Sequence, residues 1–327
     1  MEGPVESLIG FFSEAMGVTE VAMQLIIGAI GLVLLGFAFH REGERYSTVS
    51  AIIGWPLIGV FFYLYSEHYV EIHDPVLVLM TAGALPAGLA MSYWEHQGKD
   101  SGHDSLIWLR GCVVWSMVPY YGIYGVPNLN MAFVHITATS ANMMLEFAGL
   151  GGYEIGEMMI ERYDSSPIRV SDWDGNRWIL SETLGEGGFY VSMNSSDGNP
   201  VVAFILACSA LQSMAVFIGA IVALRTVHWK RRVRALVIAL PTIHILNVFR
   251  NAGIVWLTHT YPDWTVLGIG MFEFTHSYAA KFASLFAMFL MAVALFDLLP
   301  ELHKHITKII NPITSVLGGD SVESQHS

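Results

Sequence analysis

The recurrence of apolar runs long enough to cross a lipid bilayer constrains this chain more than any other feature. A membrane-spanning helix needs about 20 predominantly apolar residues. Apolar residues make up 54% of the chain and charged residues 13%, against about 45–50% and about 25% in soluble domains. The clearest runs lie at 21–39, 50–65, 75–92, 107–124, 201–224, 235–257 and 276–298. A weaker eighth run, 131–150, is diluted by polar residues. The pattern predicts an all-α polytopic integral membrane protein with about eight helices, or seven if 131–150 lies at the surface.

The distribution of basic residues predicts how the later helices cross the membrane. The loop at 225–234 holds five of the sixteen Lys and Arg residues. Cytoplasmic loops carry an excess of Lys and Arg, which places this loop inside. Helix 201–224 then runs inward, helix 235–257 runs outward and helix 276–298 runs inward again. The two possible helix counts agree on every residue after 150.

A polar segment at 151–200 interrupts the apolar pattern and is expected to lie outside the membrane. It contains nine Asp and Glu residues against three Arg, and pieces such as "NRWIL" and "GFYVSMN" have the character of short strands. We expect a small extracellular insertion there. The resulting division comprises N-terminal transmembrane helices at 1–150, the acidic extracellular segment at 151–200, catalytic transmembrane helices at 201–299 and a cytoplasmic tail at 300–327.

Three chemically capable side chains fall at similar expected depths on the last three spans. Cys208 is the eighth residue of its run, and Arg250 lies seven residues before the outer end of the next. At 1.5 Å per helical residue, each lies roughly 10 Å below the outer boundary. His276 begins the following span at its outer end. The spacing predicts that these three residues converge in the outer leaflet of the cell membrane.

The chemistry of this trio favours thiol-based acyl transfer. A Cys becomes a strong nucleophile beside a cation or a base, whereas Arg stays protonated and stabilises a thiolate or an oxyanion. His276 then serves as general acid and base. Gln212 lies one helical turn below Cys208 on the same face of the expected helix and supports the substrate carbonyl. Glu273, three residues before His276, orients the ring if its helix begins early enough.

Two other functions remain open from the residues alone. An intramembrane Arg and His also occur along transport paths, although the chain shows no inverted repeat of the kind found in many transporters. A redox relay between Cys112 and Cys208 is the second alternative, although no Cys-X-X-Cys motif accompanies them. Neither zinc-ligand spacing nor a phosphate-binding loop is present in the sequence. We therefore expect no metal, no organic cofactor and no nucleic-acid partner.

Three sequence motifs lie at the outer ends of three consecutive spans: "ACSALQSM", "NVFRN" and "THSYAAKF". They resemble motifs of the exosortase/archaeosortase family, and particularly of its archaeosortase branch. The resemblance covers roughly residues 131–298. It implies a polytopic cysteine transpeptidase with Cys208 as nucleophile, forming an acyl-thioester, and Arg250 as the first basic catalytic residue. The third position in the family is Arg or His. His276 fills it best, with Lys281 as the other basic residue in that helix.

The resemblance also implies the substrates and the partners. The family acts on secreted and surface proteins, S-layer proteins of archaea among them, that end in a three-part sorting signal. The signal consists of a short motif (Pro-Gly-Phe in the archaeosortase branch), a hydrophobic helix and a basic cluster. The implied reaction cleaves near the motif and passes the acyl group to a membrane phospholipid, so that the product is lipid-anchored. Transfer to water instead gives simple proteolysis, and the residues leave these two outcomes open.

Overall fold

The computed structural model describes residues 4–71, 75–97, 103–163, 165–182 and 184–317, and it divides into two compact units. Unit 1 consists of Met1–Trp115, Gly219–His228 and Leu299–Ser327. Unit 2 consists of Ser116–Ile218 and Trp229–Leu298. Every residue that the sequence singles out for acyl transfer belongs to unit 2, so this unit is described in more detail.

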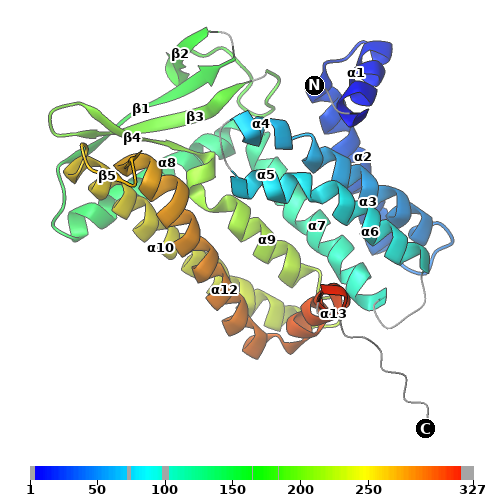
Figure 1. Ribbon diagram of the computed structural model, residues 1–327. Helices are drawn as coiled ribbons and strands as arrows, with labels where there is room; N and C mark the ends of the chain where they lie inside the picture. The colour runs from blue at the N-terminus through cyan, green and yellow to red at the C-terminus, as the bar shows by residue number, and fades with distance from the viewer. Residues whose placement is uncertain (1–3, 72–74, 98–102, 164, 183, 318–327) are drawn as a thin grey trace. The chain divides into compact units, whose positions relative to one another are not determined.

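The first part of the chain is helical as far as Phe147 (Figure 1). Its helices are α1 (Pro4–Met16), α2 (Glu20–His40), α3 (Ser47–Tyr63), α4 (Ser66–Glu71), α5 (Pro75–Ala82), α6 (Ala84–Gln97), α7 (His103–Tyr124) and α8 (Pro127–Phe147). After the sheet described below, the helices are α9 (Leu211–Val222), α10 (Trp229–Thr260), α11 (Met271–Glu273), the π-helix η3 (Phe274–Ala279), α12 (Ala280–Leu298) and α13 (Pro300–Leu317). A two-stranded hairpin, β5 (Thr265–Val266) and β6 (Ile269–Gly270), connects α10 to α11.

Among the described residues, five helical segments are long and apolar enough to cross a membrane. They are Glu20–His40, Ser47–Val70, Pro75–Gln97, Trp229–Thr260 and Met271–Leu298. The chain is therefore consistent with a polytopic helical membrane protein, and the expected total of seven or eight spans remains a prediction. The weak run at 131–150 lies mainly in the 21-residue helix α8, which is not among the five.

The polar segment after α8 forms most of a four-stranded antiparallel sheet in unit 2 (Figure 1). Its strands are β1 (Tyr153–Arg162), β2 (Ser165–Arg169), β3 (Leu184–Ser195) and β4 (Pro200–Ile205), in the spatial order β2-β1-β3-β4. A 3-10 turn, η1 (Val170–Asp172), follows β2. One face of the sheet contributes Tyr153, Val191, Met193 and Phe204 to an apolar cluster with α8 and α10. The expected strand "GFYVSMN" lies within the twelve-residue β3, whereas the expected strand "NRWIL", at 176–180, forms bends and contains no strand.

The apolar run at 201–224 differs from the single membrane helix that the sequence predicts. Its first residues form strand β4, which pairs with β3 from Pro200 to Ile205. The 3-10 turn η2 (Leu206–Ser209) follows, and helix α9 has only 12 residues. A short apolar run rich in β-branched residues suits a buried strand as well as a helix, and periodicity alone does not separate them. The available partner strand β3 decides the outcome here.

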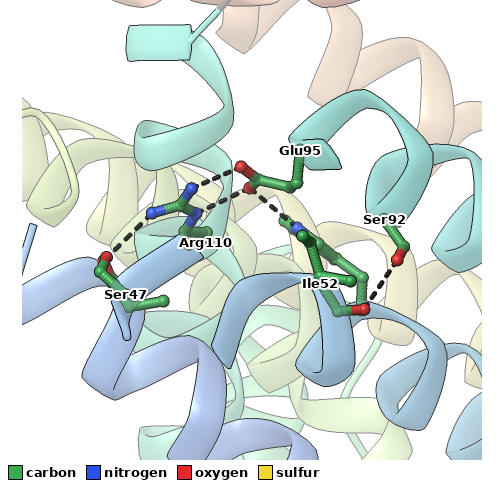
Figure 2. Close-up of polar contacts among 7 residues, drawn as sticks. Ser47, Ile52, Ser92, Glu95 and Arg110 are labelled. Atoms are coloured by element: carbon green, nitrogen blue, oxygen red, sulfur yellow. Dashed lines mark hydrogen bonds and ion pairs between the residues drawn. The ribbon is translucent and has the colours of Figure 1, made fainter. Parts of the chain in front are cut away.

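A buried ion pair joins α6 to α7 within unit 1 (Figure 2). The Arg110 Nε donates to Glu95 Oε1 at 2.7 Å, and a second guanidinium nitrogen donates to the other carboxylate oxygen. The Trp55 indole also donates to Glu95, and Arg110 Nη1 donates to the Ala38 carbonyl at 3.1 Å. Arg110 is 1% exposed and Glu95 0%. Both charges are therefore paired and hydrogen-bonded, as an ionised group in an apolar interior requires.

Close helix packing brings these partners together. A Cβ placed on Gly88 of α6 would lie 2.6 Å from the Trp55 carbonyl oxygen of α3. Such a distance is sterically impossible, so only glycine permits this approach of the two backbones. The close contact between α3 and α6 lets Ser92 Oγ donate to the Ile52 carbonyl at 2.7 Å, and it places Glu95 beside Trp55 (Figure 2).

Breaking the ion pair is expected to destabilise the protein strongly. Arg110→Leu leaves the Glu95 carboxylate buried without its cation, which costs about 3–5 kcal/mol. The double variant Glu95→Leu/Arg110→Leu is expected to recover most of that loss because it leaves no unpaired charge. Thermal unfolding in detergent, followed by size-exclusion chromatography, measures both. Glu44→Gln is the control, because it breaks the exposed Arg41–Glu44 pair, which is worth about 0–1 kcal/mol. A single variant as stable as the native chain contradicts this account.

Candidate active site

Cys208 lies in a sharp turn between a strand and a helix. Strand β4 leads into η2, and Ala210 then adopts a left-handed conformation with φ 58° and ψ 13° before α9 begins. Ser209 closes the turn, since its Oγ donates to the Leu206 carbonyl at 2.6 Å and accepts from the Leu211 N–H at 3.2 Å. Cys208 is 8% exposed and belongs to the apolar cluster beneath the sheet. The turn thus carries the thiol at the junction between the sheet and α9.

The left-handed Ala210 permits a prediction about the turn. An L-residue other than glycine in this conformation costs about 1–2 kcal/mol. Ala210→Gly removes that strain and is expected to keep stability within about 1 kcal/mol of native, because glycine also loses more conformational freedom on folding. Ala210→Val adds a β-branched side chain that tolerates positive φ poorly, and we expect it to lower both stability and thiol reactivity. Thermal unfolding and the alkylation rate of Cys208 measure these effects, and an equal response to the two substitutions contradicts the role of the turn.

Two asparagines of α10 hold the main chain of Cys208. Asn247 Nδ2 donates to the Cys208 carbonyl oxygen at 2.7 Å, and Asn251 Nδ2 donates to the same oxygen at 2.9 Å. The two residues are four apart, so they lie on one face of the helix. Both side chains are buried, at 6% and 3% exposure. The turn that carries the thiol is thereby fixed to α10 at two points.

Arg250 lies on the same helix, between these two asparagines in the sequence. Its Nη1 donates to Asn247 Oδ1 at 3.4 Å. The guanidinium is close enough to the Cys208 thiol for the two groups to interact electrostatically. The Arg250 Nε is buried and has no hydrogen-bond partner among the described residues. The structure therefore brings the candidate nucleophile and the candidate cation together and leaves one guanidinium donor for another group.

His276 and Glu273 lie on the segment that follows the β5–β6 hairpin. His276 is in the π-helix η3, where its ring stacks on Phe272 with centroids 5.3 Å apart and planes 11° from parallel. Glu273 is exposed at the end of α11. Lys281 lies in the first turn of α12. The segment packs against α10, and the hydrogen bonds described above join Cys208 and Arg250 to Asn247 and Asn251.

Gln212 does not have the relation to Cys208 that a continuous helix predicts. Because Ala210 is left-handed, the two residues lie on opposite sides of a break in the helix. Gln212 is exposed, and its Nε2 donates to the Tyr120 hydroxyl at 3.3 Å. The depth estimate for Cys208 also fails in its premise, because residues 201–205 are extended rather than helical.

The residues that sequence reasoning missed are mainly the asparagines. Asn247 and Asn251 flank Arg250 in "NVFRN", and two amides four residues apart in an apolar helix are a usable signal of a polar partner. A second missed contact joins the sheet to the end of α10, where the Tyr153 hydroxyl lies 2.9 Å from His259 Nδ1. No pattern in the sequence connects this pair, since the two residues are 106 positions apart. Within the described ranges, no cluster of three His, Cys, Asp or Glu residues has a metal-binding arrangement.

Comparisons with known proteins find matches over most of the chain. The family model for transmembrane exosortases matches residues 20–296, which is most of the chain and includes every candidate residue. Archaeosortase A of Haloferax volcanii is 24% identical over 238 residues, covering 72% of this chain and 70% of that protein. No solved structure matches the chain.

Proposed function

The chain belongs to the transmembrane exosortase family, and we propose that it is a cysteine transpeptidase that cleaves the C-terminal sorting signals of secreted and surface proteins. Cys208 is the nucleophile and Arg250 stabilises the thiolate and the oxyanion. His276 is the general acid and base. One observation carries the proposal: the Cys208 thiol lies in a strand-to-helix turn, within electrostatic range of a part-buried Arg250.

The proposed reaction begins when His276 accepts the proton of the Cys208 thiol and the sulfur attacks the carbonyl carbon of the scissile peptide bond. Negative charge then develops on the carbonyl oxygen. The Arg250 Nε–H, a buried donor without a partner among the described residues, is available to stabilise that charge. The C–N bond breaks as His276 donates a proton to the departing amine. A thioester on Cys208 and a free C-terminal peptide remain.

In the second half of the reaction an amine attacks the thioester carbonyl. His276 accepts the proton of that amine, the C–S bond breaks and the Cys208 thiol is regenerated. We propose a membrane phospholipid with an amine headgroup as the acceptor, so that the product stays anchored to the outer leaflet. Attack by water at the same step gives a soluble product with a free carboxylate.

The substrate arrangement follows from the expected orientation of the helices. The basic loop at 225–234 is predicted to be cytoplasmic, which places Arg250 and the Cys208 turn toward the outer surface. A sorting signal with a hydrophobic helix and an inner basic cluster then presents its short motif at the same level. We propose Pro-Gly-Phe as that motif because the chain resembles Archaeosortase A.

The test of this function is a reporter protein carrying the three-part signal, produced together with the full chain. The expected result is loss of the C-terminal segment from the reporter, with a new C-terminus heavier than the free carboxylate by the mass of a phospholipid less one water. A reporter with the motif replaced by alanines is the matched control and should remain uncut. A product with a free carboxylate supports cleavage but contradicts lipid transfer. An intact reporter with the native motif contradicts cleavage of this signal.

A further inference from the structure

Asn247 has no role in the proposed reaction, but it contacts two of the residues that do, Cys208 and Arg250. The Cys208 carbonyl lies at the end of a 3-10 turn, and the left-handed Ala210 diverts the chain before α9 begins. Carbonyl groups at the ends of helical turns lack their usual intrahelical partners. Here the amides of Asn247 and Asn251 satisfy that carbonyl at 2.7 Å and 2.9 Å. The carbonyl belongs to Cys208 itself, so the contact restrains the residue that bears the thiol.

The orientation of the Asn247 amide follows from the chemistry of its two neighbours. The Cys208 carbonyl oxygen only accepts hydrogen bonds, so the amide nitrogen must face it. The amide oxygen is then left for Arg250, whose guanidinium only donates, and the Nη1 to Oδ1 distance is 3.4 Å. An aspartate at 247 lacks the donor, and a leucine lacks both groups. Asparagine therefore suits a position between a backbone acceptor and a cationic donor.

We propose that Asn247 and Asn251 are positioning residues that hold the Cys208 thiol in register with the Arg250 guanidinium. The inference rests on the proposed function, because it assigns those two groups to the reaction. Asn247 contributes more to this positioning than Asn251, since it contacts both the Cys208 main chain and the Arg250 side chain. Asn251 adds a second restraint on the same carbonyl. Neither asparagine contacts the reacting atoms in this arrangement.

The experiment measures how strongly Arg250 raises the alkylation rate of the Cys208 thiol, in the presence and in the absence of the Asn247 side chain. The full chain is purified in lipid nanodiscs in a Cys112→Ser background, and the alkylation rate of Cys208 with iodoacetamide is measured at neutral pH. Arg250→Gln is expected to lower this rate roughly tenfold when Asn247 is present. In an Asn247→Ala background, the same substitution is expected to change the rate by less than about twofold.

Asn130→Ala is the matched control. Asn130 is also a buried asparagine of unit 2 whose Nδ2 donates to a backbone carbonyl, that of Tyr124 at 3.4 Å. The Arg250→Gln effect should stay roughly tenfold in that background. A loss of the effect in both backgrounds indicates general loosening of the fold and overturns the inference. An undiminished effect in Asn247→Ala, or no effect of Arg250→Gln in the native background, overturns it as well.

Asn251→Ala keeps the proposal testable if Asn247→Ala does not fold. This variant retains the Asn247–Arg250 contact, so the Arg250→Gln effect should fall only to roughly threefold. An unchanged effect removes Asn251 from the proposal. Alkylation of Cys208 needs no peptide substrate, so it tests the positioning role independently of peptide cleavage. If only the proposed transpeptidase function is wrong, the reporter stays uncut while Arg250→Gln still lowers the alkylation rate.

Discussion

Replacing Cys208 with serine is expected to lower cleavage of a sorting-signal reporter by roughly 10³-fold or more, because the alcohol is a far weaker nucleophile at neutral pH. The substitution changes little else, since serine is nearly isosteric and the carbonyl held by Asn247 and Asn251 belongs to the backbone. Cys112→Ser should leave cleavage within about twofold of native, because Cys112 lies on α7 and takes no part in the proposed reaction. Gel mobility and C-terminal mass of the reporter measure both variants.

The same pair of variants separates the alternative functions. A redox relay between Cys112 and Cys208 requires both thiols, so any activity that depends on the relay should be lost in either variant. Native cleavage in Cys208→Ser contradicts the assignment of the nucleophile and leaves the thiol as an apolar member of the cluster beneath the sheet. Size-exclusion chromatography of Cys208→Ser confirms whether a lost activity reflects chemistry rather than folding.

Replacing Arg250 with glutamine is expected to slow cleavage by roughly 10²–10³-fold, the usual effect of removing one donor that stabilises a developing oxyanion. The chain retains the thiol, so a slow residual reaction should remain, unlike in Cys208→Ser. Arg250→Lys is expected to recover only part of the rate, because an ammonium does not reproduce the directional Nε–H and Nη1–H donors of a guanidinium. Initial rates at saturating reporter concentration distinguish the three proteins.

Arg231→Gln provides the matched control for this prediction. It makes the same chemical change on the same helix, at an exposed position whose Nη2 donates to the Leu298 carbonyl at 2.9 Å. Cleavage should stay within about twofold of native, as is usual for a surface substitution. If Arg250→Gln behaves like Arg231→Gln, the guanidinium has no part in the reaction, and its electrostatic contact with the thiol is incidental.

The membrane class and the sheet region were predictable, because both depend on patterns summed over many residues. Long apolar runs identify membrane helices through length alone, and the acidic, glycine-containing segment after α8 indicates strands and turns. The end of that sheet was not predictable. Residues 201–205 belong to the same apolar run of the sequence as α9, and only their pairing with β3 makes them a strand.

The proximity of Cys208 to Arg250 was predictable from the sequence, whereas the contacts that hold the two residues in place were not. A thiol and a guanidinium in apolar surroundings are rare enough to attract notice, and the structure places them within electrostatic range. The left-handed Ala210 carries no local signal, because alanine ordinarily favours a helix. The wrong placement of Gln212 follows from that missed break. The contacts of Asn247 and Asn251 join residues 39 and 43 positions apart, which a single sequence does not connect.

The burial of Cys208 has a consequence for the fate of any acyl group attached to it. Cys208 packs against apolar side chains from the sheet, α8 and α10, and little of the residue is accessible to solvent. In the proposed mechanism, water reaches this thioester slowly, whereas the amine of a lipid headgroup approaches along the membrane interface beside the helices. We therefore expect solvent exclusion, rather than the intrinsic nucleophilicity of the two acceptors, to set the ratio of aminolysis to hydrolysis. In the proposed mechanism, the thioester therefore retains the free energy of the cleaved peptide bond until an amine attacks it.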